Sequence, residues 1–510
     1  MIQDLKDIIL PSIEADVEMI WDEDAIEKFQ AATHCHICKE PLSPTDVTKD
    51  HDHFSGVFRG RTHSNCNLQY QIPKKNYNVP IFIHNSKNYD THMIVQAIKK
   101  EYGRIRLIPN NMEKYISLQI GKLRFADSFQ FLAFSLGELV KNVKHFTYLK
   151  EHFPDENQLR LLTKKGVFPY DYMDNVERFQ ETSLPSQAEF YNKLNDTSLN
   201  DADYLHAQEV WNVFKCKTMK DYHDVYLKSD VLLLADVFSE FREECYLSYG
   251  LDPAHYFSLP GYSCECALKY SGVQLELITN VDMYQMVEKG IRGGVCSIMQ
   301  RYSKANNRYM RDYDPEQETI NNAYLDANGL YAHSMCQHLP TSAFEWVNAE
   351  DLEDLVKNLV DVPADSDIGY ILEVDLKYPK HLHDAHNCYP LAADHMTVDR
   401  EMLSTYQQER YPKFGKIAKL VPNLFDKSKY VCHYVNLKLY TSLGMVVTAV
   451  HRAIKFKQSD WLAGYINLNI AKRQQATADN DDIGKVVYKL LNNAVSIFLL
   501  HDTFAYCMIA

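Results

Sequence analysis

The amino-acid sequence is 510 residues long, which predicts about three to four domains at roughly 100–200 residues each. Hydrophobic residues make up 46% of the chain and charged residues 24%, a globular balance that excludes a disordered or fibrous protein. The formal net charge of -14 argues against a protein that coats nucleic acid non-specifically, although this total does not exclude a local basic channel.

Among the twelve cysteines, only Cys35, Cys38 and Cys66 have the spacing of metal ligands. This usage favours a reduced, intracellular protein over a disulfide framework. The acidic first twenty residues do not resemble a signal or transit peptide. No apolar run approaches the ~20 residues that span a bilayer, so we expect no membrane partner.

The predicted elements alternate between helices and strands over most of the chain. A 3.6-residue apolar period predicts one long helix over 222–247, whereas "NVPIFIHN" and "IGYILEVDLKYP" are typical of strands. In chain order we expect a helix in 1–33, a polar segment over 34–72, strands at 78–85 and 121–132, the helix 222–247, strands at 323–335 and 368–379, a loop-rich segment at 405–430 and two helices in 458–495. This alternation predicts a mixed α/β fold.

Residues 35–66 contain two ligand pairs, Cys35-x2-Cys38 and His63-x2-Cys66. A short knuckle can bring both side chains of each pair to one ion, and Cys/His sets of four are typical of structural zinc. Two incidental cysteines are the alternative reading of a single CxxC pair. The second pair at the right spacing favours zinc.

The string "DHDH" and the residue after the last ligand add possible chemistry to this knuckle. The arrangement resembles the ββα-metal nucleases, specifically the endonuclease VII type of HNH fold. The resemblance implies that Asp50 and Asn67 hold a Mg²⁺ ion and that His51 activates water. That family usually has a third cysteine where this chain has His63, which is also a good zinc ligand. An active nuclease and an inert structural relic both remain open, and the relic is favoured because other motifs carry the chemistry.

Two groups of polar residues about 140 positions apart resemble the second and third exonuclease motifs of family B DNA polymerases. They are Asn85-x3-Tyr89-Asp90, after a predicted strand, and Tyr226-x3-Asp230, on the long helix. Such an exonuclease needs carboxylates on rigid elements to hold two Mg²⁺ ions. The resemblance implies that Asp90 and Asp230 bind metal, Asn85 orients the DNA strand, and Tyr226 positions the attacking water.

A basic strip from Lys289 to Arg311 contains six basic residues and no acidic one. A solvated basic face is the alternative to a binding site. Gly293 and Gly294 allow the backbone to approach phosphate, and family B polymerases of this type have a Tyr/Gly-Gly element that couples template binding between domains. We therefore expect Gly293 and Gly294 to contact DNA.

Two later strings resemble polymerase motifs A and B. "YLDANGLYAHSM" contains Asp326 and Tyr331 in the DxxSLYP pattern, and "GKVVYKLLNNAV" contains Lys489 and Asn493 in the KxxxNSxYG pattern. The resemblance implies that Asp326 binds the catalytic metals and Tyr331 excludes a 2′-hydroxyl. It also implies that Lys489 contacts the α-phosphate, Arg473 holds the outer phosphates, and Asn493 completes the dNTP site.

The motifs occur in the order of a family B DNA polymerase, and the likeness covers about residues 25–495. It is similar to the protein-primed branch, including polymerases of Polinton or Maverick transposons and related viruses. The resemblance implies Mg²⁺ or Mn²⁺ as catalytic cofactor, structural Zn²⁺, and a DNA template-primer, dNTPs and a terminal (priming) protein as partners. An intracellular location follows, with the nucleus and a viral factory both open.

The same resemblance divides the chain into domains. They are a helical segment (1–33), a zinc knuckle (34–72), a partial ribonuclease H-like 3′–5′ exonuclease domain (73–250), a palm (251–455) with an insertion at about 340–440, partial helical fingers (456–495) and an aberrant tail (496–510). In the protein-primed branch the insertion grips the priming protein. The basic contacts expected there are Lys413, Lys416, Lys419, Lys427 and Lys429.

Three parts of the family pattern are missing from these 510 residues. Asp16-Val17-Glu18 spells the D-x-E of the first exonuclease motif, but it lies too near the knuckle and is interpreted as a coincidence. The second palm motif, YxDTDS, and the thumb are absent. We expect a DNA-directed DNA polymerase with proofreading exonuclease whose isolated chain has little or no polymerase activity. The alternatives are a zinc-knuckle DNA endonuclease and a non-enzymatic DNA-binding transposon remnant.

Overall fold

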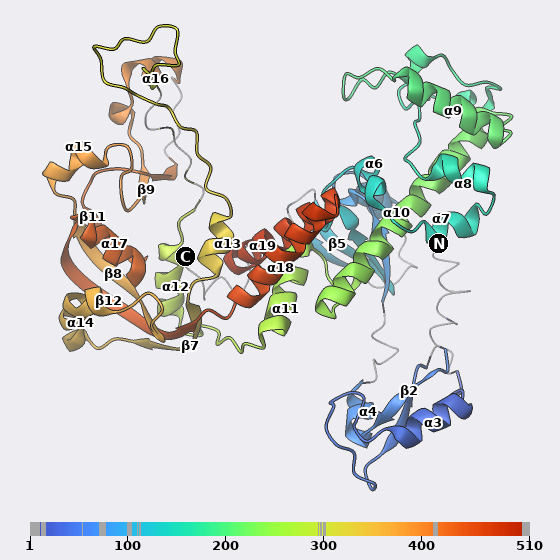
Figure 1. Ribbon diagram of the computed structural model, residues 1–510, viewed down its shortest axis with the longest axis horizontal. Coiled ribbons are helices and arrows are strands. Elements are labelled where there is room, and N and C mark those ends of the chain that lie inside the picture. Colours follow the sequence, from blue (N-terminus) through green and yellow to red (C-terminus); the bar gives the residue numbers. More distant parts are fainter. Residues whose placement is uncertain are drawn as a thin grey trace. The chain divides into compact units, whose positions relative to one another are not determined.

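The chain forms two compact units, Met1–Ala133 and Phe134–Ala510. Both contain helices and strands, which confirms the predicted mixed α/β fold (Figure 1). The computed structural model describes residue 11, residues 17–53, 55–70, 78–98, 105–109, 111, 114–293, 295, 298, 302–411 and 417–501, with side chains up to residue 495. Among the helices of these described residues, none has the length and apolarity to cross a membrane. The domain boundaries expected from the sequence stay predictions.

The first unit begins with a helix followed by a ββα motif. The elements are α3 (Glu23–Ala31), β1 (Thr48–His51), β2 (Phe58–Thr62) and α4 (Ser64–Tyr70). β1 and β2 pair antiparallel, and α4 follows β2 directly. Residues 17–22 precede α3 without helix, so in the described part the helix predicted over 1–33 is shorter than expected.

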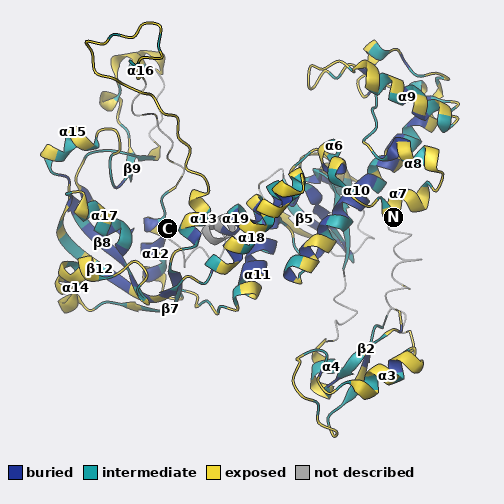
Figure 2. Ribbon diagram, in the orientation of Figure 1, coloured by how far each residue is buried: buried dark blue, intermediate teal, exposed yellow. Residues whose placement is uncertain are grey.

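This motif has a small apolar core. The rings of Trp21, Phe29 and Phe58 meet edge to face, with centroids 5.4 to 6.2 Å apart. Among the described residues from 17 to 70, the only buried apolar side chains are Ala25 and Cys35, and Figure 2 shows most of this region as exposed or intermediate. Packing alone therefore gives the motif little stability.

A four-stranded sheet and one helix complete the first unit: β3 (Val79–Ile83), α5 (Asp90–Ala97), β4 (Ile105–Pro109), β5 (Tyr115–Ile120) and β6 (Leu123–Asp127). The strand order is β3-β6-β5-β4, with β3 and β6 parallel and the other pairs antiparallel. Strands β3 and β6 confirm the two strands predicted here. Because parallel strands end at the same edge, Asp127 lies beside the residues that follow Ile83.

The second unit is organised by one long helix, α10 (Met219–Tyr249), which confirms the helix predicted over 222–247. Thr218 and Asp221 form a capping box at its start, and Gly250 ends it in a left-handed conformation with φ of 64°. Shorter helices surround it: α6 (Leu136–Leu139), α7 (Thr147–His152), α8 (Glu156–Leu162), α9 (Asp201–Val213) and α11 (Leu259–Ser271). Residues of α8, α9 and the first turns of α10 share one apolar core.

A second sheet and its covering helices comprise α12 (Val281–Gly290), β7 (Leu339–Trp346), α14 (Leu352–Asn358), β8 (Ile368–Lys377), β11 (Lys427–His433), α17 (Tyr434–Ser442) and β12 (Val446–Ser459). The strands are antiparallel in the order β11-β8-β12-β7. Leu372 and Val374 pack on one face with residues of α14 and α17, and Ile371 packs on the other face with α12. Strand β8 confirms the strand predicted at 368–379.

Two further helices follow β12, as predicted for 458–495. They are α18 (Ala463–Ala478) and α19 (Asp482–His501), and the short helix α13 (Leu330–Met335) packs against both (Figure 1). The segment 405–430 is less loop-rich than predicted. It contains α16 (Thr405–Arg410), the strand β10 (Ala418–Val421), which pairs with β9 (Asp394–Thr397), and the start of β11.

The strand predicted at 323–335 is wrong. Residues 323–327 have no regular structure, Tyr324 and Leu325 are 98% and 88% exposed, and the chain turns at Gly329 into α13. A strand needs a neighbour for its backbone hydrogen bonds, and the four strands of the second sheet pair with one another. The apolar pattern of this segment therefore has no sheet partner among the described residues.

Candidate metal and DNA-processing sites

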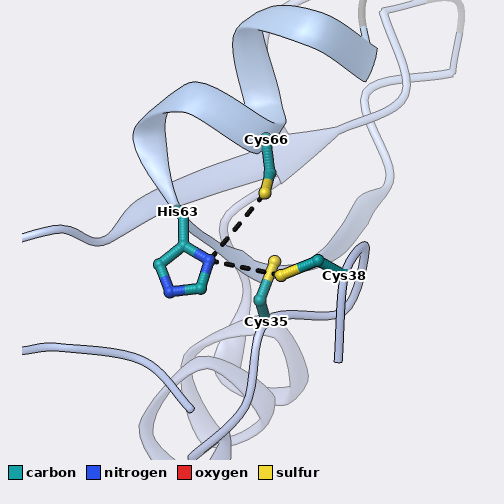
Figure 3. Close-up of side chains that lie close together, drawn as sticks. All are labelled: Cys35, Cys38, His63 and Cys66. Carbon is teal, nitrogen blue, oxygen red and sulfur yellow. Dashed lines mark hydrogen bonds between the residues drawn. The ribbon is translucent and has the colours of Figure 1, made fainter. Parts of the chain in front are cut away.

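Four side chains of the knuckle, Cys35, Cys38, His63 and Cys66, converge as predicted for a metal site (Figure 3). Their ligand atoms all lie within 4.8 Å of one another. His63 Nδ1 lies 3.4 Å from Cys38 Sγ and 3.8 Å from Cys66 Sγ. A tetrahedral zinc ion, with bonds of ~2.3 Å to sulfur and ~2.0 Å to nitrogen, separates such atoms by about 3.6 Å. The donor set therefore fits zinc.

Neighbouring groups determine which of these ligand atoms carry a proton. The Pro41 carbonyl accepts a hydrogen bond from His63 Nε2 at 3.2 Å, which places the proton on Nε2 and leaves the Nδ1 lone pair for the ion. Burial of the Cys35 thiol opposes its ionisation, but hydrogen bonds from Thr62 and from backbone N–H groups outweigh burial and lower the pKa to about 5. Burial and hydrogen bonding with the other two thiols raise the pKa of Cys66 to about 11, so a metal has to drive the ionisation of this ligand.

The Asp50 carboxylate, which is expected to bind Mg²⁺, lies beside Arg59 and His36. Asp50 is 2% exposed, its Oδ1 accepts a hydrogen bond from Arg59 Nη2 at 2.8 Å, and its Oδ2 lies 2.9 Å from His36 Nε2. Arg59 thus holds Oδ1 by a hydrogen bond, whereas the buried Oδ2 faces His36 and forms no hydrogen bond with the described residues. His51 follows on β1 with its ring 4.4 Å from that of His53, and Asn67 lies on α4. The contact between Arg59 and Asp50 braces the hairpin, and the Mg²⁺ site at Asp50 and Asn67 stays a prediction.

At the edge of the first sheet, a carboxylate that the sequence analysis missed holds the exonuclease-like loop. Asp127 is 2% exposed and accepts hydrogen bonds from the backbone N–H groups of Asn85 at 2.7 Å, Lys87 at 3.1 Å and Phe129 at 2.9 Å. Asn85 has a left-handed backbone with φ of 62°, and Asp90 begins α5 five residues later. Asp127 therefore fixes the loop that carries both predicted residues. Its position at the carboxyl end of a predicted strand was the signal available in the sequence.

In the second unit, Lys165 joins the two predicted exonuclease residues of α10. Lys165 Nζ donates to Asp230 Oδ2 at 2.7 Å and to the Tyr226 hydroxyl at 2.9 Å, and the Tyr170 and Tyr226 hydroxyls lie 2.5 Å apart. Asp230 Oδ1 is buried and has no hydrogen-bond partner among the described residues, which fits a carboxylate that binds a cation. Burial, reinforced by the charge of Asp230, raises the pKa of Tyr226 far above its ordinary value, so its phenol stays protonated.

Lys165 and Tyr170 were not predicted from the sequence, because they precede Tyr226 by 61 and 56 positions. A lysine followed by glycine in the tyrosine-rich string "KKGVFPYDY" was the only signal for them. Asn85 and Asp90 belong to the first unit, whereas Tyr226 and Asp230 belong to the second.

The residues predicted to bind nucleotide lie on or beside α13, α18 and α19. Tyr331 is on α13 and 66% exposed, Arg473 and Lys489 are exposed on α18 and α19, and Asn493 lies one turn after Lys489. Asp326 is exposed in the irregular segment before α13. Within the part of the chain that the structure describes, the knuckle is the only cluster of three or more potential metal ligands. Asp326 by itself does not fit a two-metal centre.

Two other predicted contact regions are partly visible. Gly293 is exposed, and a Cβ built on it would meet no atom within 4 Å, whereas Gly294 lies outside the described residues. Of the lysines expected to contact a priming protein, Lys427 is only 3% exposed and donates to Asn423, so the prediction for this residue is wrong. Lys419 and Lys429 are exposed, and Lys413 and Lys416 lie outside the described residues.

Comparisons with known proteins place the chain in a family. Residues 73–496 match the family model of DNA polymerase type B, organellar and viral. Among solved structures, the chain is similar to Phi29 DNA polymerase complexed with primer-template DNA and incoming nucleotide substrates, at 13% identity and a TM-score of 0.41. It is also similar to the orthorhombic crystal form of that enzyme, at 12% identity and 0.40, and to its complex with single-stranded DNA, at 14% and 0.38.

Each of these matches covers 87% of this chain but 62% of the Phi29 chain, so the chain spans less than two thirds of that length. None of the curated protein sequences matches the chain significantly. The family model covers most of the chain and includes the exonuclease-like residues, Asp326, Arg473 and Lys489. The chain therefore belongs to the organellar and viral type B family of DNA polymerases.

Proposed function

We propose that this chain acts in DNA replication as a DNA-directed DNA polymerase of the protein-primed type with a 3′–5′ exonuclease site. The observation that carries the proposal is the family match over residues 73–496, within which the exonuclease-like and polymerase-like residues follow one another in family order. We further propose that the 510 residues bind primer-template DNA and select a dNTP but do not extend a primer, because Asp326 is the one palm aspartate of the pattern that they contain.

On the exonuclease side, Asp90 of the first unit and Asp230 of the second are each proposed to bind metal. A divalent cation at Asp230 would lower the pKa of a bound water and stabilise the leaving oxygen. Lys165 keeps Asp230 oriented and holds the Tyr226 hydroxyl through a 2.9 Å hydrogen bond. Because Tyr226 stays protonated, its hydroxyl orients the attacking water by hydrogen bonding and does not remove the proton.

On the polymerase side, Lys489 and Arg473 are proposed to bind the triphosphate, since both are exposed cations on neighbouring helices that α13 contacts. The neighbour Lys472 does not contribute a free charge, because it pairs with Glu244 at 3.6 Å and lies over the Tyr488 ring. Lys419 and Lys429 stay candidates for contact with a priming protein.

A primer-extension assay with the full 510-residue chain, Mg²⁺ and four dNTPs tests the proposal. We expect a primer-template complex that weakens as salt increases, without templated lengthening of the primer. Robust nucleotide incorporation by the unmodified chain, lost in Asp326→Asn, would contradict the proposal that the palm is incomplete. The absence of any DNA complex would contradict the polymerase assignment itself.

A non-enzymatic DNA-binding role is the second candidate, and the exposed, solitary Asp326 favours it. An exonuclease assay distinguishes the enzyme from the non-enzymatic DNA-binding protein. Shortening of a DNA strand by the unmodified chain, lost in Asp230→Asn, requires an enzyme. A nuclease centred on the knuckle receives no support from the paired Asp50 carboxylate. Nicking of duplex DNA by the unmodified chain, lost in His51→Ala, would support the nuclease hypothesis.

A further inference from the structure

The helices α18 and α19, which carry Arg473 and Lys489, meet at a buried pair of asparagines. Asn469 is 0% exposed and Asn492 is 5% exposed. Asn469 Nδ2 donates to Asn492 Oδ1 at 2.7 Å, and Asn492 Nδ2 donates to the Ile466 carbonyl at 3.3 Å. Burying an amide is costly unless it is hydrogen-bonded, and the bonds that satisfy it have a fixed direction. The Asn469–Asn492 pair therefore constrains how the two helices meet more closely than apolar contacts do, because apolar contacts have no preferred direction.

Two further helices hold this hydrogen-bonded pair from one side. The Tyr249 hydroxyl on α10 donates to Asn469 Oδ1 at 2.6 Å. Burial raises the pKa of Tyr249 far above its ordinary value, so this phenol stays protonated and remains a donor. Ser263 on α11 donates to the Leu491 carbonyl of α19 at 2.6 Å. The helices α10 and α11 thus fix the position of both α18 and α19.

Glu244 on α10 faces the two residues that directly precede the predicted triphosphate ligands. Its Oε1 accepts a hydrogen bond from the Tyr488 hydroxyl at 2.6 Å and lies 3.6 Å from Lys472 Nζ. Successive helical residues point about 100° apart, so Arg473 and Lys489 turn away from Glu244. Both are exposed. The two predicted ligands therefore lie on the side of the α18–α19 pair that α10 leaves open.

The asparagine pair also sets the level of the two cations along the helices. Arg473 comes one turn after Asn469, and Lys489 comes one turn before Asn492. Residues 479–481 connect α18 to α19, and so short a connection makes the helices antiparallel. One turn onward in α18 and one turn back in α19 therefore lead in the same direction. Both cations lie at the same level of the pair, beyond the two asparagines.

We propose that the Asn469–Asn492 pair, held by Tyr249, positions Arg473 and Lys489 to bind one triphosphate, and the proposal rests on the proposed nucleotide binding by these two cations. Packed helices can shift against each other by about 1–2 Å, and a misplacement of about 1 Å weakens a charged contact. A buried polar pair selects one arrangement of two helices, because the other arrangements leave its groups unpaired. The two asparagines are thus positioning residues, which act on the nucleotide through Arg473 and Lys489.

The test uses the full chain, a labelled primer-template and fluorescence anisotropy in Ca²⁺. It compares how far the complementary dNTP and the corresponding dNMP tighten DNA binding, since the dNMP lacks the outer phosphates assigned to Arg473. Tyr249→Phe/Asn469→Leu/Asn492→Leu replaces every side chain of the hydrogen-bonded chain by an apolar one, which can leave stability unaltered. We expect the preference for dNTP over dNMP to fall roughly tenfold in this triple variant. The denaturant midpoint should stay unchanged, which separates positioning from a loss of folding.

The matched control is Tyr246→Phe/Asn467→Leu, which makes the same kinds of substitution at exposed positions of α10 and α18 and should keep the preference. A folded triple variant with the full preference overturns the proposal and leaves nucleotide binding standing. Equal loss of dNTP and dNMP binding shows a structural role only and also overturns it. If the triple variant does not fold, Asn492→Leu decides, because it breaks the contact between the helices and keeps the Tyr249 bond; an unchanged preference in Asn492→Leu overturns the proposal. No tightening by dNTP in the unmodified chain contradicts both nucleotide binding and the positioning role.

Discussion

Removal of the metal should unfold the knuckle while the second unit stays folded. Among the described residues from 17 to 70, only Ala25 and Cys35 are buried apolar side chains, each worth at most about 1.5–3 kcal/mol. Ordering each residue of the motif costs roughly 1–2 kcal/mol, so this core cannot hold the fold alone. A structural zinc contributes about 10–16 kcal/mol in small domains, which exceeds the whole stability of many of them.

Hydrogen exchange measured by mass spectrometry, with and without a zinc chelator, tests this reasoning. We expect one zinc per chain by elemental analysis and loss of amide protection over β1, β2 and α4 on chelation, with α10 unchanged. Cys66→Ser should reproduce the loss, whereas Cys388→Ser, which removes an exposed thiol outside the cluster, should not. Full protection of β1 and β2 in zinc-free protein would refute the reasoning.

Three further predictions concern groups that the structure places in unusual surroundings. Burial lowers the pKa of Lys427 to about 8, so the unfolded chain binds this proton more tightly than the folded chain does. The free energy of unfolding should therefore rise by on the order of 3 kcal/mol between about pH 8 and 10.5. Denaturant titrations of Lys427→Met should not show that rise. Arg452 donates two hydrogen bonds to Glu373, at 2.8 and 3.2 Å, and Glu373 is only 5% exposed. Arg452→Met should therefore lower the free energy of unfolding by about 3–5 kcal/mol in the same titrations, because it leaves the Glu373 carboxylate uncompensated. A double variant that also replaces Glu373 with Leu should recover most of this free energy. Asp127→Ala should lower the free energy of unfolding by about 1–3 kcal/mol and increase amide exchange over residues 85–89, because three backbone N–H groups lose their acceptor. Unchanged exchange over these residues would count against the role of Asp127 in holding the loop.

Local sequence patterns predicted the elements that depend on residues close together in the chain. The helix over 222–247 follows from apolar periodicity and appears as α10, with its capping box and terminal glycine. The metal cluster follows from ligand spacing, because each CxxC-like pair is short enough to reach one ion. The strand expected at 323–335 failed because a strand depends on neighbours that are distant in sequence, and none pairs with these residues in the described structure.

The candidate site was predictable to a similar extent. Tyr226 and Asp230 were predicted from their spacing, and they lie one turn apart on one helix. Lys165, Tyr170 and Asp127 were missed because their roles depend on contacts formed over 40 or more positions, such as the 61-residue separation of Lys165 from Tyr226. For Asp50, a familiar local string predicted a metal ligand; the structure places Arg59 and His36 beside its oxygens, and the role of Asp50 stays a prediction.

The most direct test of the central claim is whether a templated nucleotide tightens DNA binding by the full chain. Fluorescence anisotropy of a labelled primer-template in Ca²⁺ should show stronger binding with the dNTP complementary to the next template base than with any other dNTP. The difference should disappear when Lys489 and Arg473 are both replaced by alanine. Binding that is the same with every dNTP and in the double variant would contradict the account.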